Sequence, residues 1–313
     1  MPPQFEPGSF RDPDTKIFRH NDVIFRCLTL RALDDWTRLA STSFFDRLTR
    51  EGHIVQTKQV TDRTALPELD EKWVAVLEHE AIPFISYPYE WPFRMLKDAA
   101  LLQLDLTLAA IHEGMTLKDA TPFNVQWVGS RPTFIDVGSF TVYKEGEPWA
   151  GYRQFCNQFL YPLFLQAYKN VAYHPWLRGS LEGIEVGQLN ALMSIRDYMR
   201  PGVLAHVYLQ AKAQSRYEAV DRDIKKDLRT AGFGVGLIKN NLQRLRRIIE
   251  RLEWGPTRSI WSEYTKEHSY EDTDLRRKSD FVQRVLTRRR WFLVWDIGCN
   301  TGTYSRLSSE HAE

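Results

Sequence analysis

The sequence GMTLKDATPFNVQWVGSRPTFIDVGSF, from Gly114 to Phe140, decides the fold class of this chain. Two short apolar runs within it, Val125 to Val128 and Pro132 to Val137, have the length and composition of strands. The segment before it, Met95 to His112, repeats apolar residues at near-helical spacing and predicts a long helix. The polar residues beside the predicted strands are Asp119, Asn124 and Asp136. The stretch therefore predicts mixed α and β structure that carries potentially reactive side chains.

The residues before the long helix favour strands. Asn21-Asp22 is a turn-forming pair between two runs that alternate apolar and polar residues, which is typical of a hairpin. Prolines at both ends of the segment Pro88 to Pro92 then break the pattern. The elements expected here are a hairpin from Lys16 to Leu30, a helix from Asp34 to Leu48, and strands at Trp73 to Leu77 and Ile82 to Ser86.

The residues after Phe140 are mostly helical by pattern, beginning at Tyr152. Between Leu237 and Leu252 one apolar stripe is flanked by basic residues, and Gly255-Pro256 is expected to end that helix. A new strand is predicted at Phe292.

Composition narrows the class of protein. The chain has 313 residues, of which 43% are hydrophobic, and its net charge is only +2, so no whole-molecule field would hold nucleic acid or an anionic membrane. Three separated cysteines and eight histidines form neither a C-x-x-C pair nor an H-x-x-x-H spacing. No apolar run is long enough to span a membrane. We therefore expect a cytoplasmic protein without a nucleic-acid partner; the sequence leaves its oligomeric state open.

The spacing of Asp119, Asn124 and Asp136-Val137-Gly138 resembles the protein-kinase-like superfamily, whose catalytic loop has an Asp five residues before an Asn and whose later D-x-G supplies a metal ligand. The resemblance implies a two-lobed domain over residues 8–215, with its hinge at Tyr87 to Trp91. It also implies ATP and Mg²⁺ as cofactors, Asp119 as the base, and Asn124 and Asp136 as the metal ligands.

Three departures from that pattern leave alternatives open. Leu117 stands where protein kinases usually have His, and the only glycine before the hairpin is Gly8, so no Gly-rich loop is present. The phosphate-binding lysine is missing as well: the basic residue of the second predicted strand is Arg26, and Lys58 falls between the predicted helix and the next strand. The domain is therefore either a phosphotransferase or a catalytically inactive kinase-like binding module.

A second informative stretch, WFLVWDIGCNTGTYSR, runs from Trp291 to Arg306. An apolar strand leads into Asp296, and a D-x-G-x-x-x-G turn then opens a helix. This resembles the first motif of class I S-adenosylmethionine-dependent methyltransferases rather than a dinucleotide fingerprint, because Asn300 stands where G-x-G-x-x-G needs its second glycine.

The methyltransferase resemblance implies a role for each residue of this turn. Gly298 and Gly302 would let the backbone approach the methionine part of S-adenosylmethionine, and Asp296 would face its ammonium group. The helix from Asp274 would border the cofactor. The candidate cofactor-binding residues are Asp296, Gly298, Asn300, Gly302, Tyr264, Tyr270 and Lys278.

These observations predict an α+β chain in three parts. Residues 8–215 form a two-lobed protein-kinase-like domain, residues 216–257 a helical connector, and residues 258–313 the first strand and helix of a Rossmann-like α/β methyltransferase domain. Only eleven residues follow Gly302, so we expect this chain to be a truncated form. The complete protein is expected to transfer a methyl group to a small-molecule or glycan acceptor.

Overall fold

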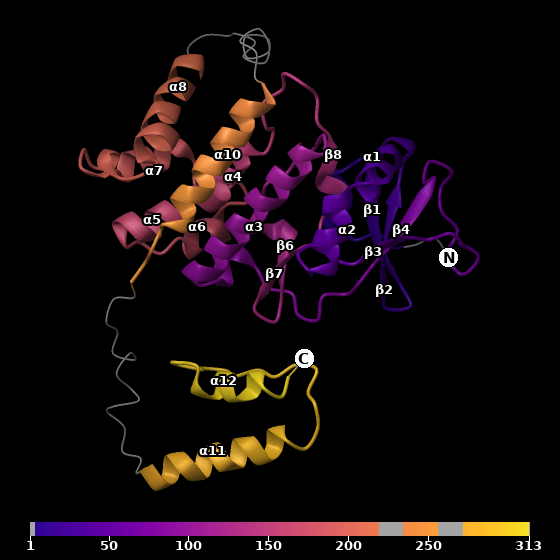
Figure 1. Cartoon of the computed structure of the whole chain (residues 1–313), viewed down its shortest axis with the longest axis vertical. Coiled ribbons are helices and arrows are strands. Elements are labelled where there is room, and N and C mark those ends of the chain that lie inside the picture. Colours follow the sequence, from indigo (N-terminus) through magenta and orange to yellow (C-terminus); the bar gives the residue numbers. More distant parts are fainter. Residues whose placement is uncertain (1–3, 219–233, 256–271, 313) are drawn as a thin grey trace. The chain divides into compact units, whose positions relative to one another are not determined.

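The computed structural model describes residues 4–218, 234–255 and 272–312 and shows a mixed α+β protein (Figure 1). The chain divides into two compact units, Met1–Trp254 and Gly255–Glu313. The first unit combines an antiparallel sheet with a helical part, and the two join through short strands.

The four-stranded sheet of the first unit has the order β1-β2-β4-β3, with every neighbouring pair antiparallel. Its strands are β1 (Thr15–His20), β2 (Val23–Leu28), β3 (Thr57–Gln59) and β4 (Ala75–His79). The predicted hairpin is confirmed, since Asn21 and Asp22 join β1 to β2 with φ values of 49° and 61°. Positive φ at both positions is what a type I′ turn requires.

Two predictions for this region are wrong in detail. The single helix expected from Asp34 to Leu48 is two helices, α1 (Leu30–Ala40) and α2 (Ser43–Arg50). Thr42 interrupts them because its hydroxyl donates to the carbonyl of Leu39 at 2.6 Å, a local bond that competes with helix continuation. The segment from Ile82 to Ser86 is not a strand, although it is apolar.

The helical part is built around α3 (Phe93–His112), which confirms the predicted long helix and is buried over much of its surface. The further helices are α4 (Tyr152–Phe155), α5 (Tyr161–Lys169), α6 (His174–Gly179), α7 (Val186–Leu192), α8 (Leu209–Glu218) and α10 (Val235–Glu250). The 3-10 turns are η1 (Pro7–Arg11), η2 (Pro88–Glu90), η3 (Pro122–Asn124), η4 (Val137–Ser139) and η6 (Asp197–Met199); the π-helical turns are η5 (Cys156–Leu160) and η7 (Leu204–Tyr208).

Helix α10 lies within the predicted connector of residues 216–257, and it packs along α3 as part of the first unit (Figure 1). The Lys97 ammonium on α3 donates to the carbonyls of Glu250 and Leu252, at 2.9 and 2.7 Å. The Glu250 carbonyl is one of the orphan carbonyls at the carboxyl end of α10, and Leu252 follows the C-cap, so one buried lysine fixes that end to the core.

Two short antiparallel strand pairs join the sheet to the helices. They are β5 (Met115–Leu117) with β8 (Phe140–Val142), and β6 (Val125–Val128) with β7 (Arg131–Phe134). The pair β6–β7 confirms the strands predicted between Val125 and Val137, and it carries Asn124 and Asp136 at adjacent ends.

Among the side-chain links between the sheet side of the first unit and its helical side, three bind backbone amides. The Glu113 carboxylate, just after α3, accepts from the first amides of α2, at 2.9 Å from Ser43 and 3.0 Å from Phe44. Asp35 on α1 accepts from the Val142 amide at 3.1 Å. Gln126 and Ser86 exchange two hydrogen bonds, of 3.0 and 3.1 Å.

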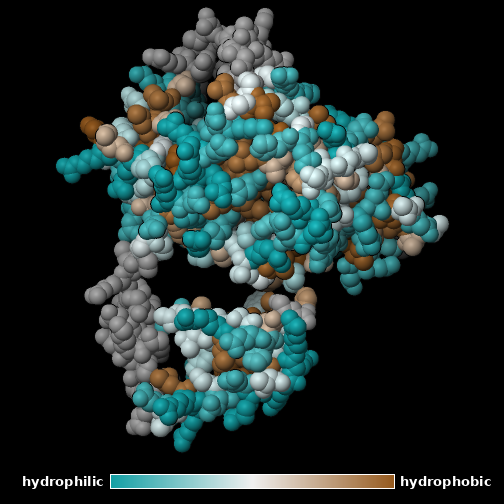
Figure 2. All heavy atoms as spheres, viewed as in Figure 1, coloured by the Kyte–Doolittle hydropathy of each residue, from teal (hydrophilic) through white to brown (hydrophobic). Residues whose placement is uncertain are grey.

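The second unit contains α11 (Asp272–Leu286) and α12 (Thr303–Ser309). The strand predicted at Phe292 does not form; Trp291 makes an isolated bridge to Ala312, and the next residues lie in irregular backbone. Four large apolar side chains of this irregular segment are exposed: Phe292 64%, Leu293 43%, Trp295 62% and Ile297 87%. Figure 2 shows hydrophobic residues at the surface of this unit. A strand needs neighbouring strands to bind its backbone groups, and the described part of this unit offers none.

No helix within residues 4–218, 234–255 or 272–312 has the length and apolar character needed to cross a membrane.

Candidate functional site

A cavity of about 590 Å³ opens between the four-stranded sheet and the β6–β7 pair. Asp119, Asn124 and Asp136 all line it, so the structure brings together the three residues predicted from the kinase-like spacing. The other polar residues on its wall include Asp12, Thr15, Arg26 and His79.

Asp136 is bound on both of its carboxylate oxygens by the chain itself. Arg26 on β2 donates from Nη2 to Oδ1 at 2.8 Å, and Asn124 donates from Nδ2 to Oδ2 at 3.3 Å. The two charged side chains are 6% and 24% exposed, so this ion pair is largely shielded from water. A buried guanidinium therefore neutralises the aspartate of the D-x-G sequence.

Gly138 makes room for this arginine. A Cβ added to Gly138 would lie 2.6 Å from Nη1 of Arg26, closer than real Cβ contacts come. A side chain at position 138 would therefore have to displace the Arg26 guanidinium.

Two further residues fix the Arg26 guanidinium. Its Nη1 donates to Thr15 Oγ1 at 3.3 Å, and its Nε donates to His79 Nε2 at 3.4 Å. His79 must then carry its proton on Nδ1, which lies 2.9 Å from Thr57 Oγ1. Burial, with a smaller contribution from the Arg26 charge, lowers the pKa of His79 to about 3, so this imidazole stays neutral.

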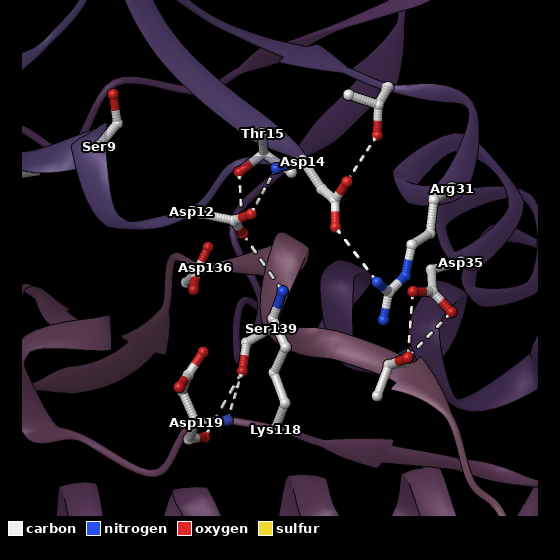
Figure 3. Close-up of polar contacts among 12 residues, drawn as sticks. Ser9, Asp12, Asp14, Thr15, Arg31, Asp35, Lys118, Asp119, Asp136 and Ser139 are labelled. Atoms are coloured by element: carbon white, nitrogen blue, oxygen red, sulfur yellow. Dashed lines mark hydrogen bonds and ion pairs between the residues drawn. The ribbon is translucent and has the colours of Figure 1, made fainter.

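A second ion pair continues the network toward the amino terminus. Asp12 accepts from Thr15 Oγ1 at 3.3 Å and from the Lys118 ammonium at 3.2 Å, as Figure 3 shows. Burial tends to raise the pKa of Asp12, but the Asp14 amide and the Lys118 charge outweigh it and lower this pKa overall.

Asp119 differs from the other acids of the polar wall. Its amide donates to Ser139 Oγ at 3.1 Å (Figure 3). Its carbonyl accepts from Gln103 at 3.1 Å, so its backbone is held in place. Its carboxylate has no hydrogen-bond partner among the residues that the structure describes. Burial raises the pKa of Asp119, and the neighbouring Asp136 charge raises it further. This carboxylate is therefore free to accept a hydrogen bond from a ligand.

The donor types at this site fit Mg²⁺, which prefers carboxylate and amide oxygens. The arrangement fits less well, because Arg26 and Asn124 occupy both oxygens of Asp136. Across the described residues, no group of three or more His, Cys, Asp or Glu side chains could hold a metal ion. The Mg²⁺ site at Asn124 and Asp136 stays a prediction.

The cavity also has an apolar lining. Its aliphatic side chains are Ile17, Ile24, Val55, Ile82, Ile85 and Ile135. Glu80, Ala81 and Ile82 also line the space. The Glu80 amide donates to the Gln56 carbonyl at 3.0 Å, whereas no partner within the described chain binds the Ala81 and Ile82 amides. The lining therefore offers apolar surface that suits a flat ring, together with polar groups that suit hydrogen-bonding substituents.

The predicted methyltransferase turn lies in the second unit. Gly298, Asn300 and Gly302 have φ values of 76°, 47° and 78°, and α12 begins directly after Gly302. Asp296 accepts a hydrogen bond of 2.7 Å from Ser305 Oγ. The predicted turn and helix are present, without the predicted strand before them.

The remaining candidates give little further support to this turn. The Lys278 ammonium lies 4.8 Å from the centre of the Tyr304 ring, a cation–π contact that links α11 to α12. Tyr264 and Tyr270 lie outside the described residues.

Sequence patterns did not identify the residues that organise the cavity. Arg26 stood out only as a basic residue in place of a lysine, and His79 and Thr15 had no signal. A buried arginine in an otherwise apolar strand, VIFRCL, was the one available hint, because such a charge requires a partner.

No family model matches the chain. It is 34% identical over 306 residues to nodulation protein NoeA of Rhizobium meliloti (strain 1021), covering 97% of this chain. The chain spans 63% of the length of that relative. The solved structure of vaccinia related kinase 3 is similar over 79% of this chain and 88% of its own, with 11% identity and a TM-score of 0.34.

Proposed function

We propose that the protein containing this chain transfers a methyl group from S-adenosylmethionine to a small-molecule or glycan acceptor. The observation that carries this proposal is the turn from Asp296 to Gly302, in which three residues adopt positive φ and a helix follows at once. Such a turn exposes backbone amides where a ligand can approach them closely.

The local geometry fits the cofactor in two respects. A Cβ placed on Gly298 would meet nothing within 4 Å, so the space beside the turn is open to a ligand. Asp296 supplies a carboxylate for an ammonium group, and only the Ser305 hydroxyl contacts it in the described structure. When bound, the sulfonium cofactor supplies an activated methyl group, and the residues named here would bind and orient it.

The similarity to NoeA is compatible with this proposal and does not establish it. The name of that relative connects it with nodulation, and its greater length leaves room for the rest of a methyltransferase domain. The glycan acceptor remains part of the proposal.

The test is calorimetric titration of the protein made from the complete reading frame with S-adenosylmethionine and S-adenosylhomocysteine. Asp296→Asn should weaken binding of S-adenosylmethionine about tenfold or more, because a charge-assisted hydrogen bond contributes about 1.5–3 kcal/mol. Asp280→Asn, an exposed acid on α11, is the matched control and should leave the affinity unchanged. Absence of binding by the unsubstituted protein would refute the proposal.

A second candidate function belongs to the cavity of the first unit. Asp119, Asn124 and Asp136 line one space, as an ATP- and Mg²⁺-dependent phosphotransferase of the kinase-like superfamily would need. The Arg26–Asp136 ion pair disfavours metal binding, and it makes a catalytically inactive kinase-like binding module the better form of this candidate. Mg²⁺-dependent release or transfer of the ATP γ-phosphate, abolished by Asp119→Asn, would restore the phosphotransferase.

A further inference from the structure

The charges on the cavity wall are not those of a phosphate site. Five acids and two arginines line it among the residues described: Glu6, Asp12, Glu80, Asp119 and Asp136, with Arg19 and Arg26. Both arginines are already paired, Arg19 with Glu6 at 3.4 Å and Arg26 with Asp136 at 2.8 Å. Asp12 is paired too, with Lys118 at 3.2 Å, whereas no ion pair joins Glu80 or Asp119 to a described cation. The lining is therefore net acidic, and a polyphosphate would be repelled unless a cation accompanied it.

A divalent cation would have to displace a cation that the chain already provides. The Arg26 side chain is buried and held by Asp136, Thr15 and His79 together. A metal ion at Asp136 would replace this ion pair and would also leave the guanidinium close to a second positive charge. The neutral His79 gives the guanidinium no alternative counter-charge.

The polar groups of the lining that no described residue binds indicate which class of ligand the cavity can hold. The Asp119 carboxylate is an acceptor that no described donor binds, and the side-chain amide oxygen of Asn124 is a second acceptor. Hydroxyl or ammonium hydrogens of a ligand match both. Ile17, Ile24 and Ile135 add apolar surface to the same lining. Ala81 and Ile82 line the cavity as well, and no described residue binds their amides, so these amides are available donors for ring nitrogens or carbonyls.

From these observations we infer that the cavity binds a nucleoside-class ligand, a flat heteroaromatic ring joined to a hydroxyl-bearing sugar, without phosphate and without a divalent metal ion. The ring lies against the isoleucines, and a sugar hydroxyl donates to the Asp119 carboxylate. Arg26 takes the electrostatic place of a metal ion on Asp136. This site is separate from the proposed methyltransferase turn and does not depend on it.

The test compares ligands on the unsubstituted full chain. Dissociation constants are measured by calorimetry for the four ribonucleosides, for ATP with EDTA, and for ATP with Mg²⁺. At least one nucleoside should bind about tenfold or more tightly than ATP, and Mg²⁺ should change the nucleoside affinity less than about twofold. Tighter binding of Mg-ATP than of every nucleoside would overturn the inference and favour a phosphotransferase. Binding by none of these ligands would overturn it as well.

One substitution tests whether the charge of Asp119, rather than its size, determines the choice of ligand. Asp119→Asn keeps the size of the side chain and removes its charge, so it should weaken nucleoside binding about tenfold while strengthening binding of metal-free ATP. Asp46→Asn, on the exposed surface of α2, is the matched control and should change neither affinity. Equal weakening of both ligands by Asp119→Asn would contradict the charge argument.

Discussion

The chain contains two turns of nearly the same sequence, Asp136-Val137-Gly138 in the first unit and Asp296-Ile297-Gly298 in the second. Their middle residues have opposite environments, because Val137 is 3% exposed and Ile297 is 87% exposed. Their aspartates differ in their partners: a buried arginine binds Asp136, whereas a serine hydroxyl binds Asp296.

The two glycines are also required for different reasons. Gly138 is needed because a neighbouring side chain fills the space that a Cβ would take, whereas Gly298 has open space and a φ of 76° that only glycine adopts easily. A short motif can thus recur in one chain with one copy completed by internal packing and the other open to a ligand.

The largest expected effect on stability comes from removing Arg26, the partner of Asp136 in the first turn. Arg26→Ala should lower the free energy of unfolding of the first unit by about 3–5 kcal/mol, because it leaves Asp136 shielded from water with no cation. Urea unfolding followed by circular dichroism measures this. Arg19→Ala on the neighbouring strand, whose ion pair with Glu6 is exposed, should cost less than about 1 kcal/mol. Equal losses for the two variants would show that Asp136 is hydrated.

A smaller effect tests the two glycines directly. Gly138→Ala should destabilise the first unit by about 1–3 kcal/mol, because the new methyl group displaces a guanidinium that three partners hold. Gly298→Ala should leave the first unit unchanged and affect only its own turn. Hydrogen exchange with mass spectrometry resolves the two units separately. Gly187→Ala in α7, where a Cβ meets nothing, should be neutral or slightly stabilising.

Lowering the pH should reduce the free energy of unfolding of the first unit through protonation of His79. Folding keeps this imidazole neutral by lowering its pKa from 6.5 to about 3. The contribution of the neutral imidazole to the free energy of unfolding is therefore complete above pH 6.5. It is lost as the pH falls toward 3, at about 1.4 kcal/mol per pH unit. His79→Gln, which keeps an acceptor for Arg26, should reduce the pH dependence of unfolding by that amount between pH 6 and 4. An unchanged slope would mean that His79 is already charged or is solvated in the native state.

The smallest effect belongs to the second turn. Ile297→Thr should change stability by less than about 0.5 kcal/mol, because the side chain is already 87% exposed. The Val294 amide should exchange without measurable protection, since the residues around it form no strand ladder. High protection of Val294 would show that this segment pairs with a strand in solution.

Local patterns in the sequence predicted the elements that local physics decides. The hairpin at Asn21-Asp22 and the long helix ending at His112 follow from turn chemistry and from apolar periodicity. The gathering of Asp119, Asn124 and Asp136 was predictable too, because the three are close in sequence and their spacing resembles that of a known superfamily.

The remaining features depend on contacts that sequence distance hides. Arg26 meets Asp136 across 110 positions of the chain, and no local pattern announces such a pairing. The segments at Ile82 and Phe292 are apolar enough for strands, but neither has a partner strand in the described structure. Strand formation is decided by the neighbour as much as by the segment itself.

The links between the two sides of the first unit affect how the cavity can open. Glu113, Asp35 and Gln126 each bond backbone amides on the opposite side, at three separate points. Relative rotation of the sheet and the helices would have to break all three links. Ligand entry should therefore proceed through side-chain motion at the cavity mouth, and small-angle scattering curves recorded with and without a bound nucleoside should superimpose.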